Sequence, residues 1–133
     1  MAKSEHRVQA DSIGREFVDA FNRRDADGLV ALSHPDIEFR PTMLAGSKRV
    51  YKGHEGLRCW VAELVASGAQ HHVRVSEIRK LDDRRFLLLS EVLLDGEAVA
   101  PSAMVAKLAG GKIIEDHAYL SDEGMLVELD LLS

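Results

Sequence analysis

Residues 86–96 read FLLLSEVLLDG, an apolar run with strand character that ends in a turn-forming Asp-Gly pair. Segments 73–81, 98–108 and 112–120 follow the same two-residue period. The joints between these segments are short turn-forming pairs: Asp82-Asp83, Asp95-Gly96 and Gly110-Gly111. Strands joined by such short turns pair as antiparallel hairpins. The sequence therefore predicts a four-stranded antiparallel meander in the second half of the chain.

The first half of the chain carries a helical period instead. Ile13, Phe17 and Phe21 recur on one stripe, which predicts an amphipathic helix over about 8–22 with Phe17 facing inward. Asp25 can cap a second, short helix, which should end before Pro35 because a residue that precedes proline disfavours the helical conformation. Two consecutive helices are therefore expected to open the chain.

Three further elements complete the predicted order. Residues 37–40 alternate apolar and polar up to a proline, which indicates a short strand. A third helix is expected from Gly53 to Ser67, with Trp60 on its buried face. Apolar residues after Asp122 predict a short terminal helix. The expected fold class is α+β, with the helices gathered on one side of a mostly antiparallel sheet.

Strand segments 86–89 and 92–94 are apolar on both faces. A sheet with one face in water alternates apolar and polar residues, so both faces of this sheet need cover. Either the outer face meets another subunit, or the chain has more helix than the periodicity shows. We favour the first, and expect a homodimer that forms through the outer face of the sheet.

Composition limits the classes of function. The 133 residues are expected to form a single domain spanning 1–133. A net charge of −5 argues against a nucleic-acid partner, and no apolar run is long enough for a membrane span. The lone Cys59 cannot form an internal disulfide, no cluster has zinc-ligand spacing, and the first fifteen residues lack an apolar signal core. We expect a cytoplasmic protein without a cofactor or a metal.

Particular stretches carry a family resemblance. They are residues 15–22 (REFVDAFN), 25–29 (DADGL), 51–57 (YKGHEGL), 111–115 (GKIIE) and 124–126 (GML). In order and spacing the chain resembles the SnoaL-like polyketide cyclase branch of the nuclear transport factor 2-like superfamily, which includes ketosteroid isomerase. The resemblance implies a cone-shaped, strongly curved sheet wrapped around the first and third helices, with a pocket at its open end. This fold serves isomerases, cyclases, hydrolases and non-catalytic binders, so the chemistry depends on the residues.

Ketosteroid isomerase provides a test of those residues. Its chemistry needs an Asp base, with a Tyr and a protonated Asp as oxyanion donors. The resemblance places the tyrosine at Phe17, the base at Arg40 and the protonated acid at Met104, within one residue. Phenylalanine has no proton to donate, and arginine stays protonated. The sequence therefore predicts that this chain does not isomerise ketosteroids.

The cyclases use an aspartate near the end of the final strand, and the resemblance leaves Ala118 and Ser121 at the corresponding places. Asp116 is the nearest carboxylate and shares a strand face with Ala118 and Leu120. If that face looks into the pocket, Asp116 is the best candidate for an acid/base. The alternative is a surface or rim aspartate. His117 lies on the opposite face, and His71 and His72 are expected in solvent.

Arg40 could clamp a substrate carboxylate or phosphate beside Asp116, or form an ion pair at the rim. The predicted pocket lining is mostly apolar and consists of Phe17, Trp60, Ser90, Val92, Ser102, Met104, Ala118 and Leu120. One hypothesis is a cofactor-independent cyclase, isomerase or hydrolase for a small hydrophobic polyketide-, terpenoid- or aromatic-like molecule, with Asp116 and Arg40 as catalytic residues. The other is a non-catalytic binding or dimerisation module.

Overall fold

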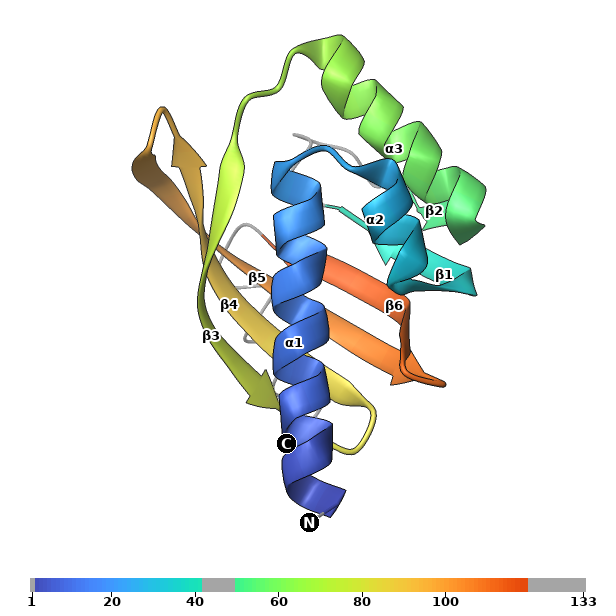
Figure 1. Cartoon of the computed structure of the whole chain (residues 1–133). Coiled ribbons are helices and arrows are strands. Elements are labelled where there is room, and N and C mark those ends of the chain that lie inside the picture. The colour runs from blue at the N-terminus through green and yellow to red at the C-terminus, as the bar shows by residue number, and fades with distance from the viewer. Residues whose placement is uncertain (1, 42–49, 120–133) are drawn as a thin grey trace.

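The computed structural model describes residues 2–41 and 50–119, with side chains from residue 11 onward. Three helices and six strands lie in these ranges (Figure 1). The helices are α1 (Ala2–Asn22), α2 (Ala26–Ala31) and α3 (Gly53–Ser67). The strands are β1 (Ser33–Arg40), β2 (Tyr51–Lys52), β3 (His72–Lys80), β4 (Arg85–Leu94), β5 (Glu97–Ala109) and β6 (Lys112–Tyr119). The predicted α+β order is confirmed, and the terminal helix expected from Asp122 lies outside the described residues.

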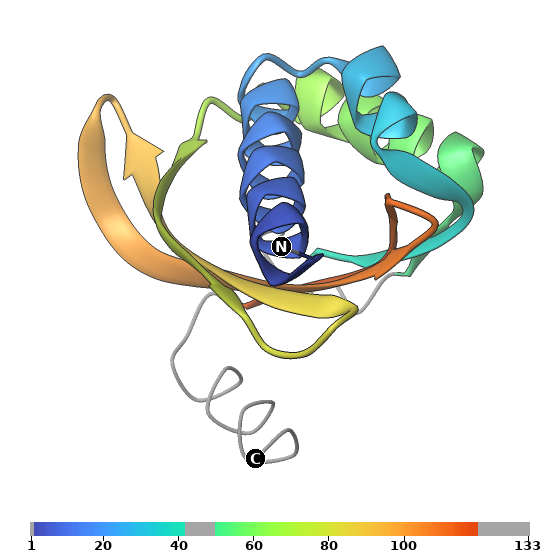
Figure 2. The ribbon, with the colours of Figure 1, turned by 60° about the horizontal axis from the view of Figure 1, so that its bottom comes forward.

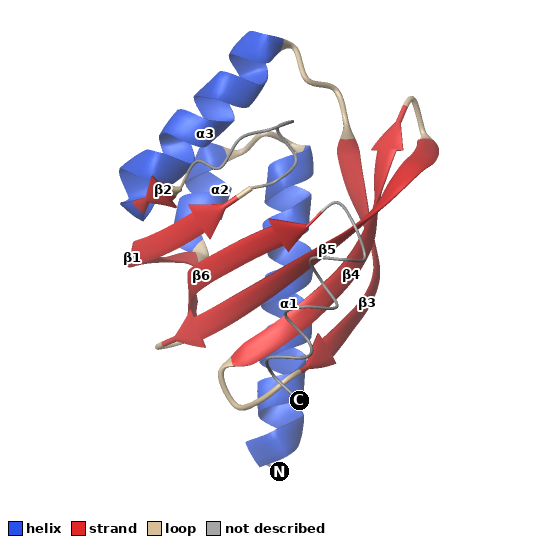
Figure 3. Ribbon diagram, turned by 180° about the vertical axis from the view of Figure 1, so that it is seen from behind, coloured by secondary structure: helices blue, strands red, loops and turns tan. Residues whose placement is uncertain are grey.

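All six strands form one mixed sheet in the order β2-β1-β6-β5-β4-β3 (Figure 3). The predicted meander is confirmed, because β3 to β6 pair antiparallel in succession. β1 instead pairs parallel with β6, so that Phe39 lies opposite Asp116. Parallel neighbours need a long crossover, and α3 with four strands (β2 to β5) lies between these two in the sequence. This pairing brings the short first strand beside the last described one.

The sheet curves around α1, while α2 and α3 lie over the edge that holds β1 (Figure 2). α1 approaches the sheet closely at Gly14, where an added Cβ would lie 3.0 Å from Cδ1 of Ile78. The missing side chain therefore allows the helix to settle into the curve. No helix in the described ranges has the length and apolar character needed to cross a membrane.

Hydrogen bonds fix the start of α2 and the end of α1. The Asp25 carboxylate accepts the backbone N–H of Gly28 at 3.0 Å, which confirms the predicted N-cap of α2. At the end of α1, the Asn22 side chain donates to the Val73 carbonyl and accepts the Val73 N–H, both at 2.8 Å. Arg24 donates to the carbonyl of His71 at 2.8 Å. These bonds tie α1 to the start of β3.

The outer face of the sheet carries a small apolar cluster. Leu87, Ala103 and Val105 pack together there and are 2%, 5% and 6% exposed. Leu87 belongs to the stretch 86–89, whose apolar residues on both faces led us to expect a dimer. The single chain already buries these three residues, and the homodimer remains a prediction.

Candidate functional site

Asp116 lies in the middle of β6 on the inner face of the curved sheet. Its side chain is 0% exposed, and its register partners are Phe39 on β1 and Ala106 on β5. Side chains alternate along a strand, so Ala118 shares this inner face while His117 lies on the outer one. The structure therefore buries Asp116 completely, in contrast to a rim aspartate.

None of the described residues compensates the buried carboxyl group of Asp116 by a hydrogen bond or an ion pair. Neither Oδ1 nor Oδ2 has a hydrogen-bond partner among the described residues. Burial raises the pKa of the Asp116 carboxyl well above its usual range, because the charged form is desolvated. The neutral form is the one that fits this environment. A neutral carboxyl can donate a hydrogen bond or a proton, which a carboxylate cannot.

A cavity of about 40 Å³ lies on the inner face of the sheet, and its wall includes two neighbours of Asp116: its register partner Phe39, and Ala118, two residues further along β6. Asp116 itself is not among the residues that line the cavity. The full lining is Phe17, Val18, Phe21, Phe39, Pro41, Trp60, Val73, Leu88, Ser90, Ala103, Met104 and Ala118. Such a volume holds a few water molecules, whereas pockets for drug-sized ligands measure about 300–1,000 Å³.

Aromatic rings form one side of the cavity. The Phe39 and Trp60 ring centroids are 4.4 Å apart, and Phe21 stacks on Trp60 at 5.3 Å. The indole N–H of Trp60 is buried without a hydrogen-bond partner in the described part of the chain. Such an orphaned donor is uncommon in a folded protein. The indole of Trp60, in the cavity wall, and the carboxyl of Asp116 therefore both lack hydrogen-bond partners among the described residues.

Another side of the cavity carries a satisfied polar pair. Ser90 on β4 lies opposite Ser102 on β5, and their hydroxyl oxygens are 2.6 Å apart. Both residues are buried, and Ser90 contributes to the cavity wall. One hydroxyl of the pair donates to the other, so this wall is polar at one point and apolar around it.

The structure brings five of the eight residues expected to line a pocket to the cavity wall: Phe17, Trp60, Ser90, Met104 and Ala118. Val92 and Ser102 are buried but do not belong to the wall, which corrects our expectation for both. A register shift between Val92 and Leu93 alters the alternation near the end of β4. Leu120 lies outside the described residues.

Arg40 does not lie in the cavity. Its side chain is exposed, and it pairs in register with His117, whereas its neighbour Phe39 faces inward opposite Asp116. Adjacent strand residues point to opposite faces, so Arg40 and Asp116 lie on different sides of the sheet. Our expectation that the Arg40 guanidinium is held beside Asp116 is corrected. The alternation of apolar Ile37 and Phe39 along the strand already indicated that Arg40 faces away from the core.

His71 also differs from the expectation that it is solvated. Its ring lies 5.7 Å from that of Phe21, and its Nε2 is buried without a hydrogen-bond partner among the described residues. Burial lowers the pKa of His71, and the charges of Arg24 and His72 lower it further. His71 is therefore a neutral group packed behind the aromatic wall. Within residues 2–41 and 50–119, no three His, Cys, Asp or Glu residues gather as a metal site.

Comparison with known proteins identifies the family of the chain. The sequence profile of the SnoaL-like domain matches residues 14–116. No protein of curated function matches the sequence.

Solved structures share the fold. A proposed isomerase of the SnoaL-like family from Agrobacterium tumefaciens aligns at TM-score 0.71 and 13% identity, over 86% of this chain and 98% of that one. A proposed polyketide cyclase from Sinorhizobium meliloti aligns at 0.65 and 17%, over 81% and 94%. A proposed ketosteroid isomerase from Kribbella flavida aligns at 0.68 and 14%, over 85% and 78%. At these identities the likeness shows the fold alone, while the profile match covers most of the sequence. The chain belongs to the SnoaL-like domain family, within the nuclear transport factor 2-like fold.

Proposed function

We propose that this protein is a cofactor-independent acid/base enzyme that acts on the carbonyl group of a small hydrophobic molecule, with Asp116 as the proton donor and acceptor. The observation that carries the proposal is the Asp116 carboxyl, which is completely buried, has no hydrogen-bond partner among the described residues, and has two neighbours, Phe39 and Ala118, in the wall of an aromatic cavity. Buried polar groups normally have partners, and an exception calls for an explanation such as a catalytic role. Asp116 is the group around which the reaction takes place.

The proton transfers follow from the neutral state of Asp116. One carboxyl oxygen takes a proton from the carbon next to the substrate carbonyl, while the Oδ–H on the other oxygen donates to the carbonyl oxygen, where negative charge develops. The substrate becomes an enol, and the acid is restored with its proton on the other oxygen. Isomerisation is completed when Asp116 donates a proton to a different carbon and takes back the enol proton. Aldol-type ring closure is completed when the enol carbon attacks a second carbonyl and Asp116 transfers the enol proton to the new alkoxide. Neither sequence gains or loses a proton overall, and neither changes the oxidation state.

The size of the cavity limits the substrate. About 40 Å³ accommodates the reacting end of a molecule but not a fused ring system. Met104 is the most adaptable side chain of the wall, because methionine has several rotatable bonds and fills irregular space. A small apolar ketone that displaces Met104 fits this arrangement better than a steroid.

The experiment measures deuterium exchange in D2O at the carbon next to the carbonyl of small cyclic and aromatic ketones, followed by NMR. The wild-type protein should accelerate exchange, and Asp116→Asn should lose the acceleration. Asp36→Asn is the matched control, because the Asp36 side chain is 85% exposed. It should exchange like the wild type. Equal rates in wild type and Asp116→Asn would rule out the role of Asp116.

A non-catalytic binding module is the alternative function. The small cavity favours it, and so does the absence of acidic, basic and histidine side chains from the described residues that line the cavity. Under this alternative, small ketones would bind to wild type and to Asp116→Asn, and neither protein would accelerate exchange.

We further propose that the protein works in the cytoplasm, which the single cysteine supports, and that it forms a homodimer, which the apolar strands β4 and β5 support.

A further inference from the structure

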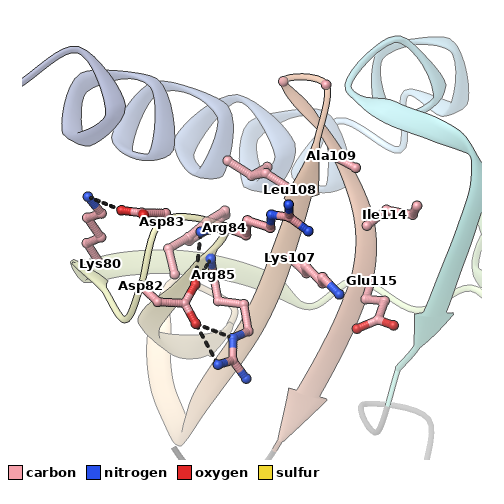
Figure 4. Close-up of a pocket in the computed structure, with 13 residues that line it drawn as sticks. Lys80, Asp82, Asp83, Arg84, Arg85, Lys107, Leu108, Ala109, Ile114 and Glu115 are labelled. Carbon is pink, nitrogen blue, oxygen red and sulfur yellow. Dashed lines mark hydrogen bonds and ion pairs between the residues drawn. The ribbon is translucent and has the colours of Figure 1, made fainter. Parts of the chain in front are cut away.

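A hollow much larger than the aromatic cavity lies away from Asp116, at the end of the sheet where two turns meet (Figure 4). Its volume is about 500 Å³, and it lies between the β3–β4 turn and the β5–β6 turn. The apolar side chains of Phe86, Leu108 and Ile114 contribute to its lining. This volume falls within the range of small-molecule sites.

Four cations surround this hollow: Lys80, Arg84, Arg85 and Lys107. Two of them are neutralised locally, since Arg85 Nε lies 2.6 Å from Asp82 Oδ2 and Lys80 lies 3.4 Å from Asp83. The side chains of Arg84 and Lys107 form no ion pair or hydrogen bond with other described residues, and no dashed line reaches either side chain in Figure 4.

The register of the sheet adds to the excess of positive charge. Lys107 lies directly opposite Arg85 on β4, and like charges in opposed positions destabilise a sheet. On its other side Lys107 faces Glu115 of β6, whose carboxylate forms no ion pair with the described residues. Once the two local pairs are set aside, Arg84 and Lys107 face the single acid Glu115. In a chain with a net charge of −5, this is a local cationic site.

The turn that carries Arg84 is held firmly. The Asp82 carboxylate accepts the backbone N–H groups of Arg84 at 2.9 Å and Arg85 at 2.8 Å. The hydrogen bond from the Arg85 side chain and those from the backbone lower the pKa of Asp82. The Leu108 N–H donates to the Arg84 carbonyl at 2.6 Å, which joins the turn to β5. The backbone positions of both unpaired cations are therefore fixed before a ligand arrives.

We propose that this hollow is a second binding site, which takes a small organic anion with its carboxylate or phosphate between Arg84 and Lys107 and its apolar body on Leu108 and Ile114. An anion there supplies the counter-charge that Arg84 and Lys107 lack among the described residues. Arginine suits this task because its planar guanidinium can make two parallel hydrogen bonds to such a group. The apolar lining gives an organic anion an advantage over an inorganic one.

The test titrates phenyl phosphate into the full-length protein, with inorganic phosphate in parallel, and follows backbone amides by NMR. Shifts should concentrate at Arg84, Leu108 and the Gly110-Gly111 turn, and phenyl phosphate should bind more tightly than phosphate. An exposed charge contact contributes up to about fivefold in Kd. Arg84→Gln and Lys107→Gln should each weaken binding by up to about that factor.

Two further variants sharpen the test. Glu115→Gln removes the competing acid and should tighten binding. Arg58→Gln is the matched control, because Arg58 is an exposed arginine on α3 that pairs with Asp27 at 2.7 Å, outside the hollow. It should bind like the wild type. The proposal fails if phenyl phosphate does not bind, if phosphate binds equally well, or if Arg58→Gln has the same effect as Arg84→Gln.

Discussion

Replacement of Asp116 by Asn should change how the stability of the protein depends on pH. Asp116 is 0% exposed, and burial raises its folded-state pKa, while an unfolded aspartate has a pKa of about 3.9. Between these two values the folded state holds one proton more than the unfolded state. The free energy of unfolding therefore falls by about 1.4 kcal/mol for each pH unit across this window. Below the window, the contribution of Asp116 is fully present.

Asparagine has nearly the same volume and does not titrate, so Asp116→Asn should lack this fall. Its buried amide has unsatisfied N–H groups, which costs about 1–3 kcal/mol at every pH. The difference in slope is therefore the quantity to measure, rather than stability at one pH. Urea unfolding at several pH values between about pH 4 and pH 8 gives the free energy of unfolding of both proteins as a function of pH. Other titrating groups, His71 included, remain in both proteins and cancel in the comparison.

As pH rises, the free energy of unfolding of the wild type should fall relative to that of Asp116→Asn. Above the folded-state pKa of Asp116, the two curves of free energy against pH should run parallel. Asp36→Asn should follow the wild type, because the Asp36 side chain is 85% exposed. Parallel wild-type and Asp116→Asn curves across the whole range would refute the reasoning. They would mean that Asp116 ionises in the folded protein as it does in the unfolded chain.

Four other outcomes are expected. The purified protein should not turn over a β,γ-unsaturated ketosteroid, because Phe17 and Met104 cannot act as oxyanion donors and the cavity is too small for four fused rings. Ser90→Ala should reduce the free energy of unfolding, measured by urea denaturation, by about 1–2 kcal/mol. The double variant Ser90→Ala with Ser102→Ala should reduce it by less than the sum of the two single changes. The His71 imidazole should titrate below 6.5 by NMR, so its contribution to stability is lost as pH falls from that value through its folded-state pKa. Sedimentation should give a dimer at micromolar concentration, and a monomer would contradict the proposed pairing of outer sheet faces.

Local patterns gave most of the secondary structure. The turn pairs and the period of two predicted β3 to β6 to within about two residues, because a hairpin depends on neighbouring residues. The first strand was placed at residues 37–40, whereas β1 begins at Ser33. β2 has two residues, which is too short for a periodic signal. α1 begins at Ala2, earlier than the apolar stripe indicated.

For the candidate site too, some features could be predicted from local patterns and others could not. Alternation along a strand was enough to group Asp116 with Ala118 and to place His117 opposite. The same rule applied to Phe39 would have placed Arg40 outside. The expectation drawn from the family for Arg40, and the one drawn from strand alternation for Val92, therefore gave way to the local register of β1 and β4.

By itself, the sequence determined the α+β class, the meander and the strand face on which Asp116 lies, because these depend on periodicity and on short turns. Only the tertiary structure decided that β1 joins β6 in parallel and that Asp116 has no hydrogen-bond partner among residues 2–41 and 50–119. It also decided that Arg84 and Lys107 meet at one hollow. The physical reason is that burial and charge pairing depend on residues far apart in the chain, whose meeting is fixed by packing of the whole core around the curved sheet.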